Sequence, residues 1–149
     1  MLHIKIKPME TKTINKSIEI KVGSGRVWEV LTQQPYANEI ISIFMEGSTV
    51  KGEFKLDAQI LYLDPSGIGV VGKVTEYKPN ALIKVSIVAE VKNNQPDFGN
   101  PNSKKWEGCY DRYELTEKDG VTILAIESVC PAEHYNDFAF GLGQKLKKN

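Results

Sequence analysis

The chain has 149 residues, of which 41% are hydrophobic and 26% are charged, the composition of a globular domain with its own core. Its 19 basic and 19 acidic side chains cancel, so no overall field would attract nucleic acid or an acidic membrane surface. No apolar run is long enough to span a bilayer, and the first residues lack the apolar segment of a secretory signal. We therefore expect a single domain over residues 1–149, located in the cytoplasm, whose residues 1–12 form a flexible arm.

A strand followed by two short helices is the first predicted structure. Isoleucines alternate with polar residues over residues 13–22, the pattern of a half-buried strand. Ser24 is a favourable N-cap for a short helix that buries Trp28. Pro35 can begin a second short helix, because the first helical position needs no N–H donor.

The middle of the chain has the pattern of an antiparallel meander. Apolar runs are separated by turn residues, for example at residues 64–67 and 118–120. Residues 92–105 form a connection too long for a hairpin, so this segment is either a mobile loop or a lid over a site. The predicted strands cover residues 43–50, 53–64, 68–77, 82–91, 106–116 and 121–130.

The hairpin around residues 78–81 predicts one apolar face. A tight turn there places Tyr77 opposite Leu82, and the other partners follow from that pair. Lys73 and Lys84 then point to water, while the opposite face is almost wholly apolar and should meet the core. The residues of that inner face are Val70, Gly72, Val74, Ile83, Val85, Ile87 and Ala89.

The last hairpin, which turns at residues 117–120, carries polar residues on both faces. We take the more apolar face as the inward one, so Asp111 and Ser128 become the polar candidates for a pocket floor. A single bulge would reverse this choice and bring Tyr110, Arg112 and Glu127 inward instead. The face taken as inward comprises Cys109, Asp111, Tyr113, Leu115, Thr122, Leu124, Ile126, Ser128 and Cys130.

Two pairs across this hairpin are predicted to be diagonal. Cys109 and Cys130 then have Cβ atoms roughly 7 Å apart, too far for an unstrained disulfide, so two free thiols in a reducing compartment are expected. Arg112 and Glu127 would form no more than a surface ion pair.

Residues 131–148 are predicted to form a long amphipathic helix. Apolar residues that include Phe138 and Leu142 recur at helical spacing on one side. Gly141 and Gly143 interrupt this stripe and leave space beside it. The predicted fold class is therefore α+β, with a curved antiparallel sheet of six to seven strands wrapped around the long C-terminal helix and two short helices after the first strand.

Four segments, taken in their order, resemble a known superfamily. They are residues 27–32 (Val-Trp-Glu-Val-Leu-Thr), residues 72–79 (Gly-Lys-Val-Thr-Glu-Tyr-Lys-Pro), Tyr113-Glu114-Leu115 followed by Gly120-Val121-Thr122, and the closing helix. The chain resembles the START-like or SRPBCC helix-grip superfamily, and within it the group related to the activator of the heat-shock chaperone ATPase. The resemblance implies a pocket for hydrophobic ligands, in a superfamily that includes lipid carriers, cyclases, hydrolases and chaperone regulators.

The expected site is a cavity between the sheet and the final helix. His134, in the first turn of that helix, suits an exposed helix start better than a general acid or base. The sequence contains no cluster with metal-ligand spacing and no nucleophile–base pair, and we expect no cofactor. The residues expected to line the cavity are Val85, Ile87, Asp111, Tyr113, Ser128, Phe138 and Leu142.

These patterns favour a non-enzymatic protein that binds a small hydrophobic or amphipathic molecule, either lipid-like or polycyclic. One alternative is a protein-interaction module of the chaperone-regulator type, with a protein partner. Another is a cyclase-like or hydrolase-like enzyme that uses the same cavity. The enzyme would require Asp111 or Glu127 buried beside Arg112, Tyr110 or His134.

Replacing Phe138 with Ala tests whether the predicted final helix packs on the sheet. The substitution should lower the free energy of unfolding by ~3–5 kcal/mol, because a large buried side chain leaves a cavity behind. Thermal or denaturant unfolding of the purified variant measures this change. A variant that melts within a degree or two of the wild type would contradict the predicted docking.

Overall fold

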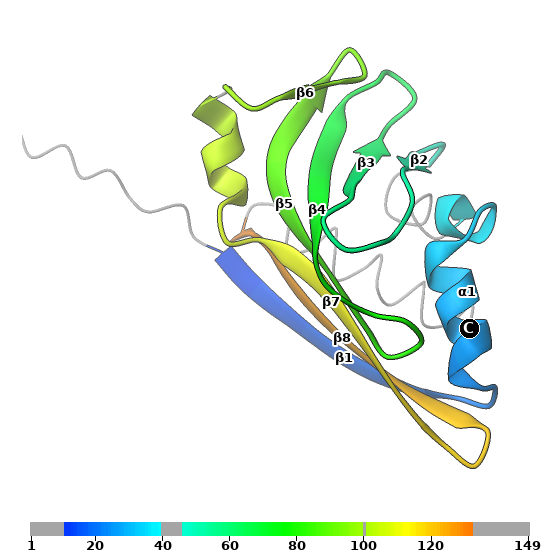
Figure 1. The fold of residues 1–149 in the computed structure, drawn as a ribbon. Coiled ribbons are helices and arrows are strands. Elements are labelled where there is room, and N and C mark those ends of the chain that lie inside the picture. The colour runs from blue at the N-terminus through cyan, green and yellow to red at the C-terminus, as the bar shows by residue number, and fades with distance from the viewer. Residues whose placement is uncertain (1–10, 40–45, 100, 133–149) are drawn as a thin grey trace, which may run out of the picture.

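A computed structural model describes residues 11–39, 46–99 and 101–132 of the chain (Figure 1). Over these residues the fold contains eight strands, the helix α1, a 3-10 helix and a helical segment at residues 36–39. The elements are β1 (Thr11–Ile20), α1 (Ser24–Thr32), β2 (Thr49–Lys51), β3 (Gln59–Leu63), β4 (Gly69–Lys78), β5 (Leu82–Lys92), β6 (Gln95–Asp97), η1 (Pro101–Trp106), β7 (Tyr110–Lys118) and β8 (Val121–Pro131).

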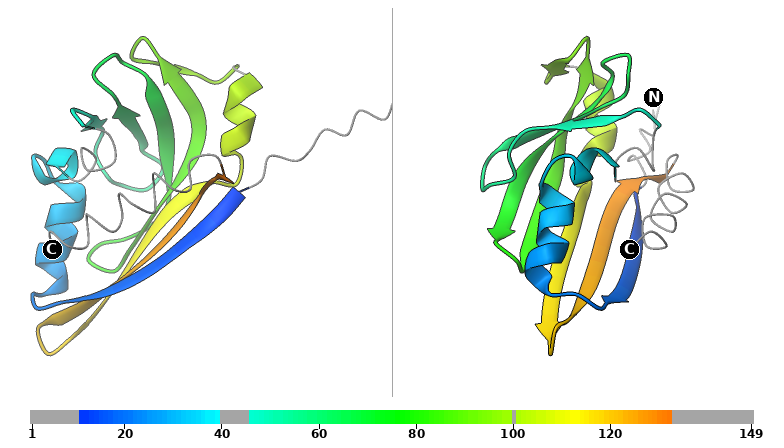
Figure 2. Two further views of the ribbon diagram at one scale, coloured as in Figure 1. Left: turned by 180° about the vertical axis from the view of Figure 1, so that it is seen from behind. Right: turned by 90° about the vertical axis from the view of Figure 1, so that its right-hand side faces the viewer.

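The strands form one antiparallel sheet with the order β1-β8-β7-β5-β4-β3-β2, and β6 pairs with β5 outside this path. The sheet curls into a half-barrel, and α1 lies against its concave side (Figure 2). The predicted α+β class and curved antiparallel sheet are confirmed, but the described residues form eight strands rather than the predicted six to seven. No helix among the described residues is long and apolar enough to cross a membrane.

Helix α1 is held at its N-terminus by a side chain from the last hairpin. The backbone N–H of Ser24 donates to the carboxylate of Glu117 at 2.5 Å, and a negative charge at this end suits the helix dipole. Gly23, rather than the predicted Ser24, occupies the N-cap position. Trp28 is buried and meets the ring of Tyr77 edge-on at 5.6 Å, so it anchors the core as expected.

The β4–β5 hairpin differs from its predicted register. Asn80 adopts a φ of 66° and closes a three-residue loop, so that Lys78 pairs with Leu82 and Tyr77 pairs with Ile83. A turn one residue longer had been predicted, with Tyr77 opposite Leu82. The loop length decides the register, because each loop geometry joins the strands at a different pair of residues.

Two further register shifts, between Val71 and Gly72 and between Val74 and Glu76, move side chains to the opposite face of the sheet. Ile60 belongs to a large apolar cluster, and its neighbour Leu61 packs against a separate smaller one. Adjacent strand residues point to opposite faces, so the two clusters lie on opposite sides of the sheet.

We call the face of the larger cluster the inner face. Val74 and Val85 lie there as predicted, whereas Ala89 lies with Val71 in the smaller cluster. Grouping Ala89 with Val85 was therefore wrong, because a bulge cannot be read from alternation alone. Ile87 is half-buried rather than buried.

The two lysines of this hairpin differ in their exposure to solvent. Lys73 is exposed as predicted. Lys84 is only partly exposed, because its ammonium lies over the ring of Tyr110, 4.2 Å from the ring centroid.

The last hairpin keeps a regular ladder from Lys118 opposite Val121 to Tyr110 opposite Val129. The face chosen as inward is confirmed, since Leu124, Ile126 and Ser128 are buried. Its exact register differs from the prediction by two residues, which leaves the faces unchanged. Asp111 lies directly opposite Ser128, and Arg112 lies directly opposite Glu127.

The long connection after β5 is neither a plain loop nor part of the next strand. It forms β6 and η1, and β7 begins at Tyr110 rather than at the predicted Trp106. Glu90 fastens the segment to β5. Its carboxylate accepts the indole N–H of Trp106 at 3.2 Å and pairs with Lys105 at 3.4 Å, while its backbone N–H donates to Ser103 Oγ at 3.0 Å. The segment is thus ordered against the sheet.

Several predicted elements fall outside the described residues. These are residues 1–10 of the arm predicted over residues 1–12, residues 40–45 at the second short helix and the next strand, and the C-terminal helix from residue 133 onward. The last two residues of the predicted arm belong to β1, which begins at Thr11. Residues 36–39 are helical, which agrees with the predicted start of the second helix.

Replacing Gly72 with Ala should destabilise the fold by about 1–3 kcal/mol, because a Cβ there would lie 2.3 Å from Cγ1 of Val85. Gly25→Ala is the matched control, since no atom lies within 4 Å of its added Cβ. Denaturant unfolding of both variants measures the difference. Equal stabilities would contradict the close β4–β5 packing described above.

Candidate functional site

A carboxylate stands in the middle of the apolar inner face. Asp111 on β7 pairs with Val85 on β5 and with Ser128 on β8, and Ser128 pairs in turn with Ile14 on β1. These four residues form one row across four neighbouring strands. Val85, Ser128 and Ile14 are buried, while Asp111 keeps part of its surface exposed.

Ser128 Oγ donates a hydrogen bond to Asp111 Oδ1 at 2.5 Å. Such a short bond is typical of a hydroxyl that donates to an ionised carboxylate. A buried serine needs a partner, and a carboxylate in an apolar face needs a donor. The facing positions on β7 and β8 supply both, so we name Asp111 and Ser128 the inner-face polar pair.

Two tyrosines, Tyr62 and Tyr113, lie close enough to Asp111 for its charge to act on their hydroxyl groups. Burial raises the pKa of Tyr62 far above the usual phenol range, and the nearby charge of Asp111 raises it further. Burial likewise raises the pKa of Tyr113 well above that range, again with a contribution from Asp111. Both phenols therefore keep their protons at neutral pH and remain able to donate hydrogen bonds.

Both cysteines lie at the same end of this face, and both are free thiols and buried. Burial raises the pKa of the Cys109 thiol to about 11, with smaller contributions from Cys130 and Asp111. Burial followed by the charge of Asp111 also raises the pKa of Cys130. The β7–β8 ladder ends with Tyr110 opposite Val129, so Cys109 and Cys130 each lie one residue beyond its last pair.

The structure brings together five of the seven predicted site residues. Val85, Asp111 and Ser128 share one row, Tyr113 lies two residues along β7, and Ile87 lies two residues along β5. Phe138 and Leu142 lie outside the described residues.

Sequence reasoning missed Tyr62, because its place near Asp111 depends on the pairing of β3 with β4. The glycine at position 72 was one local sign that another group packs closely against β4. A Cβ at Gly72 would lie 2.3 Å from Val85 Cγ1 and 3.6 Å from Tyr62 Cε2.

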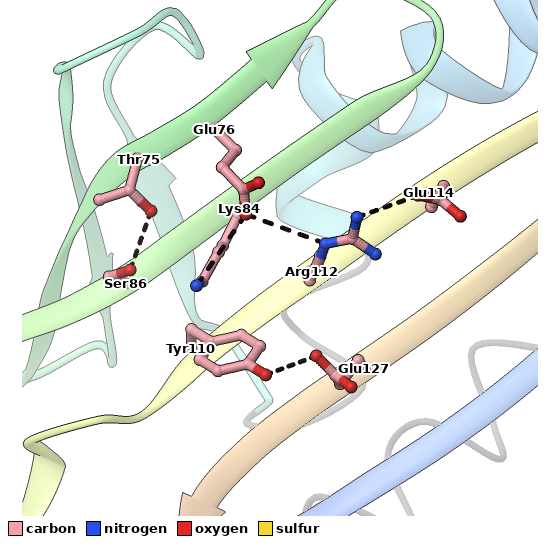
Figure 3. Close-up of polar contacts among 8 residues, drawn as sticks. All are labelled: Thr75, Glu76, Lys84, Ser86, Tyr110, Arg112, Glu114 and Glu127. Atoms are coloured by element: carbon pink, nitrogen blue, oxygen red, sulfur yellow. Dashed lines mark hydrogen bonds and ion pairs between the residues drawn. The ribbon is translucent and has the colours of Figure 1, made fainter.

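Figure 3 shows a second group of polar residues on the sheet. This group lies on the outer face, because its members on β7 and β8 alternate with Asp111 and Ser128 along the strands. Glu76, Lys84, Arg112 and Glu127 form a row across β4, β5, β7 and β8. Glu76 pairs with both Lys84 and Arg112 at 3.9 Å. We call this row with its partners the outer-face network.

The partners of Arg112 and Glu127 differ from the predicted ion pair. Arg112 Nη2 donates to Glu114 at 3.0 Å, and the hydroxyl of Tyr110 donates to Glu127. The bond to Glu127 and the burial of the phenol raise the pKa of Tyr110. Arg112 and Glu127 therefore do not pair with each other, although they lie directly opposite on the ladder. Arg112 binds Glu114 on its own strand, and Glu127 binds Tyr110 on the neighbouring strand.

The residue set required for an enzyme is divided between the two faces. Asp111 lies on the inner face, whereas Tyr110 and Arg112, its neighbours along β7, point to the outer face. Glu127 does meet Tyr110, but in the partly exposed outer-face network. His134 lies outside the described residues, and within residues 11–39, 46–99 and 101–132 no three potential ligand side chains cluster as a metal site would require.

Two open depressions occur elsewhere on the described surface. One of about 490 Å³ lies beside α1 and is lined by residues that include Trp28, Glu29 and Tyr36. The other, of about 340 Å³, lies over β1, β7 and β8 beside Arg112 and Glu127. Neither includes the inner-face polar pair.

Solved structures share this fold at low sequence identity. The Aha1 dimer from Colwellia psychrerythraea is 19% identical with a TM-score of 0.58, over 90% of this chain and 93% of that one. CalU16 from Micromonospora echinospora is 16% identical with a TM-score of 0.58, over 92% and 70%. Ms6760 from Mycobacterium smegmatis is 13% identical with a TM-score of 0.62, over 93% and 94%.

The chain therefore shares the overall fold of these solved structures. The resemblance found in the sequence is confirmed at the level of the fold. No protein-family model matches this sequence, and neither does the sequence of any curated protein. Shared fold at such identity does not determine function.

Thiol titration tests the buried cysteines. Native protein should react slowly with a thiol reagent at neutral pH, because Cys109 and Cys130 are shielded and their pKa values are raised. In the denatured protein both thiols should react rapidly with the reagent. Rapid reaction of either cysteine in the native state would contradict the packing of this end of the sheet.

Proposed function

We propose that this protein binds a small amphipathic molecule against the inner face of its sheet, without catalysing a reaction. The observation that carries the proposal is the inner-face polar pair, a hydrogen-bonded carboxylate placed in an otherwise apolar row. A ligand site of this kind is mostly apolar and holds a few polar groups that orient the ligand.

A purely structural role explains the pair less well. Charged side chains in an apolar environment lose hydration, and an apolar replacement of similar volume is often neutral or stabilising. Asp111 and Tyr113 keep part of their surface exposed although Val85 and Ile126 beside them are buried. Partial exposure at the centre of an apolar face is what a ligand would cover.

The residues of this row and their neighbours would contact different parts of the ligand. Asp111 and Ser128 would orient the polar end of the ligand, and Val85, Ile87 and Tyr113 would contact its apolar body. Phe138 and Leu142 would complete the site from the other side. Micromolar binding, on the order of 8 kcal/mol, is the expected strength for a site with one polar anchor.

Displacement of Nile red, an uncharged apolar dye, tests this function. Wild-type protein should bind the dye, and decanol should displace it at micromolar concentration, with a matching adduct in native mass spectrometry. Asp111→Asn and Ser128→Ala should each weaken decanol binding about tenfold, or ~1.4 kcal/mol.

Glu127→Gln is the matched control, because Glu127 belongs to the outer-face network on the opposite side of the sheet. Its decanol affinity should equal that of the wild type. If neither dye nor decanol binds the wild-type protein, ligand binding is wrong and the protein-interaction alternative takes its place.

A further inference from the structure

We propose that Tyr62 contributes to the specificity of the site by donating a hydrogen bond to an oxygen acceptor of the ligand, such as a carbonyl group. This inference rests on the proposed function, to which it adds a residue and a chemical class of ligand. It follows from the position of the Tyr62 ring on the inner face and from the hydrogen-bonding capacity of its hydroxyl group.

Tyr62 reaches the inner face from β3, one strand from the edge of the sheet. It pairs with Val50 on β2 and with Val70 on β4, and its ring packs against the larger apolar cluster. The ring lies beside Gly72 on β4, where an added Cβ would stand 3.6 Å from Tyr62 Cε2 and 2.3 Å from Val85 Cγ1. Gly72 therefore leaves room for the ring beside Val85, which belongs to the row that contains the inner-face polar pair.

The hydroxyl group of Tyr62 forms no hydrogen bond within residues 11–39, 46–99 and 101–132. Among these residues, Ser48 Oγ is the only fully enclosed side-chain polar atom without such a bond, so the half-buried Tyr62 keeps some accessible surface at its hydroxyl. A polar group placed among apolar side chains loses hydration and normally has a partner that compensates for the loss. The Tyr62 hydroxyl is therefore open to a partner from outside the chain.

This hydroxyl acts as a donor at neutral pH. Burial raises the pKa of Tyr62 far above the usual phenol range, and the charge of Asp111 raises it further, so the phenol keeps its proton. A carbonyl oxygen has two lone pairs and no proton of its own, which matches a phenol that has one O–H to donate. A ketone or an ester with an apolar body would satisfy Tyr62, whereas a pure hydrocarbon would leave its hydroxyl unbonded.

Packing alone does not account for the hydroxyl. A phenylalanine would fill the place of the Tyr62 ring without bringing a polar group into the apolar cluster. Tyr110 on the outer face shows the contrasting case, because its hydroxyl donates to Glu127 within the protein.

The experiment compares methyl octyl ketone with its alkene analogue, in which a methylene group replaces the carbonyl oxygen, as competitors of Nile red. The two ligands have nearly the same shape and differ in the acceptor. Tyr62→Phe should weaken ketone binding about fivefold, because one neutral hydrogen bond is lost, and should leave alkene binding unchanged. Tyr110→Phe is the matched control, since its hydroxyl belongs to the outer-face network, and it should bind both ligands as the wild type does.

The outcomes separate the two proposals. If neither ligand displaces the dye from the wild-type protein or forms an adduct in native mass spectrometry, the proposed function itself fails. If they bind but Tyr62→Phe does not weaken the ketone relative to the alkene, ligand binding stands and the inference about Tyr62 is overturned. The unliganded variant should melt like the wild type, because the hydroxyl that it lacks bonds no described residue.

A measurement on the wild-type protein decides the question without a variant. A hydrogen bond lowers the stretching frequency of a carbonyl group, so the infrared band of isotope-labelled methyl octyl ketone should shift downward from its position in hexane when the ketone binds. A bound ketone with an unshifted band would overturn the inference.

Discussion

The antiparallel pairing of β7 with β8 is the constraint on which the rest of the structure depends. Its regular ladder sets Asp111 opposite Ser128 and Arg112 opposite Glu127, and so divides the polar residues of the hairpin between two faces. A slip of β8 by one residue would exchange the two faces of that strand. It would put Glu127 among the apolar residues of the core and expose Leu124 and Ile126. The apolar residues on both strands therefore hold the register.

The β7–β8 hairpin also holds helix α1 in place at one end of the sheet. The tip of the β7–β8 hairpin supplies Glu117 to the N-terminus of α1, and Trp28 on that helix meets Tyr77 at the end of β4. The other end of the sheet is held by Glu90 through Trp106 and Lys105. The inner-face polar pair lies between these two anchored ends. A site placed on paired strands keeps its geometry better than one placed on loops.

The fold by itself does not indicate what the inner face binds, because one fold supports several functions. Ligand binding is proposed instead from the hydrogen bond that Ser128 donates to Asp111 in an otherwise apolar row. The sheet places Arg112, the neighbour of Asp111 along β7, on the opposite face.

The sequence by itself determined the strands whose side chains alternate regularly, the inward face of the last hairpin and the placement of Asp111 and Ser128 on it. Alternation suffices there because no bulge interrupts β7 or β8. The tertiary structure alone decided the faces around Val71 and Ala89, since register shifts depend on cross-strand packing. It also decided that Tyr62 lies near Asp111, because that proximity requires strands far apart in the sequence to curl around one face.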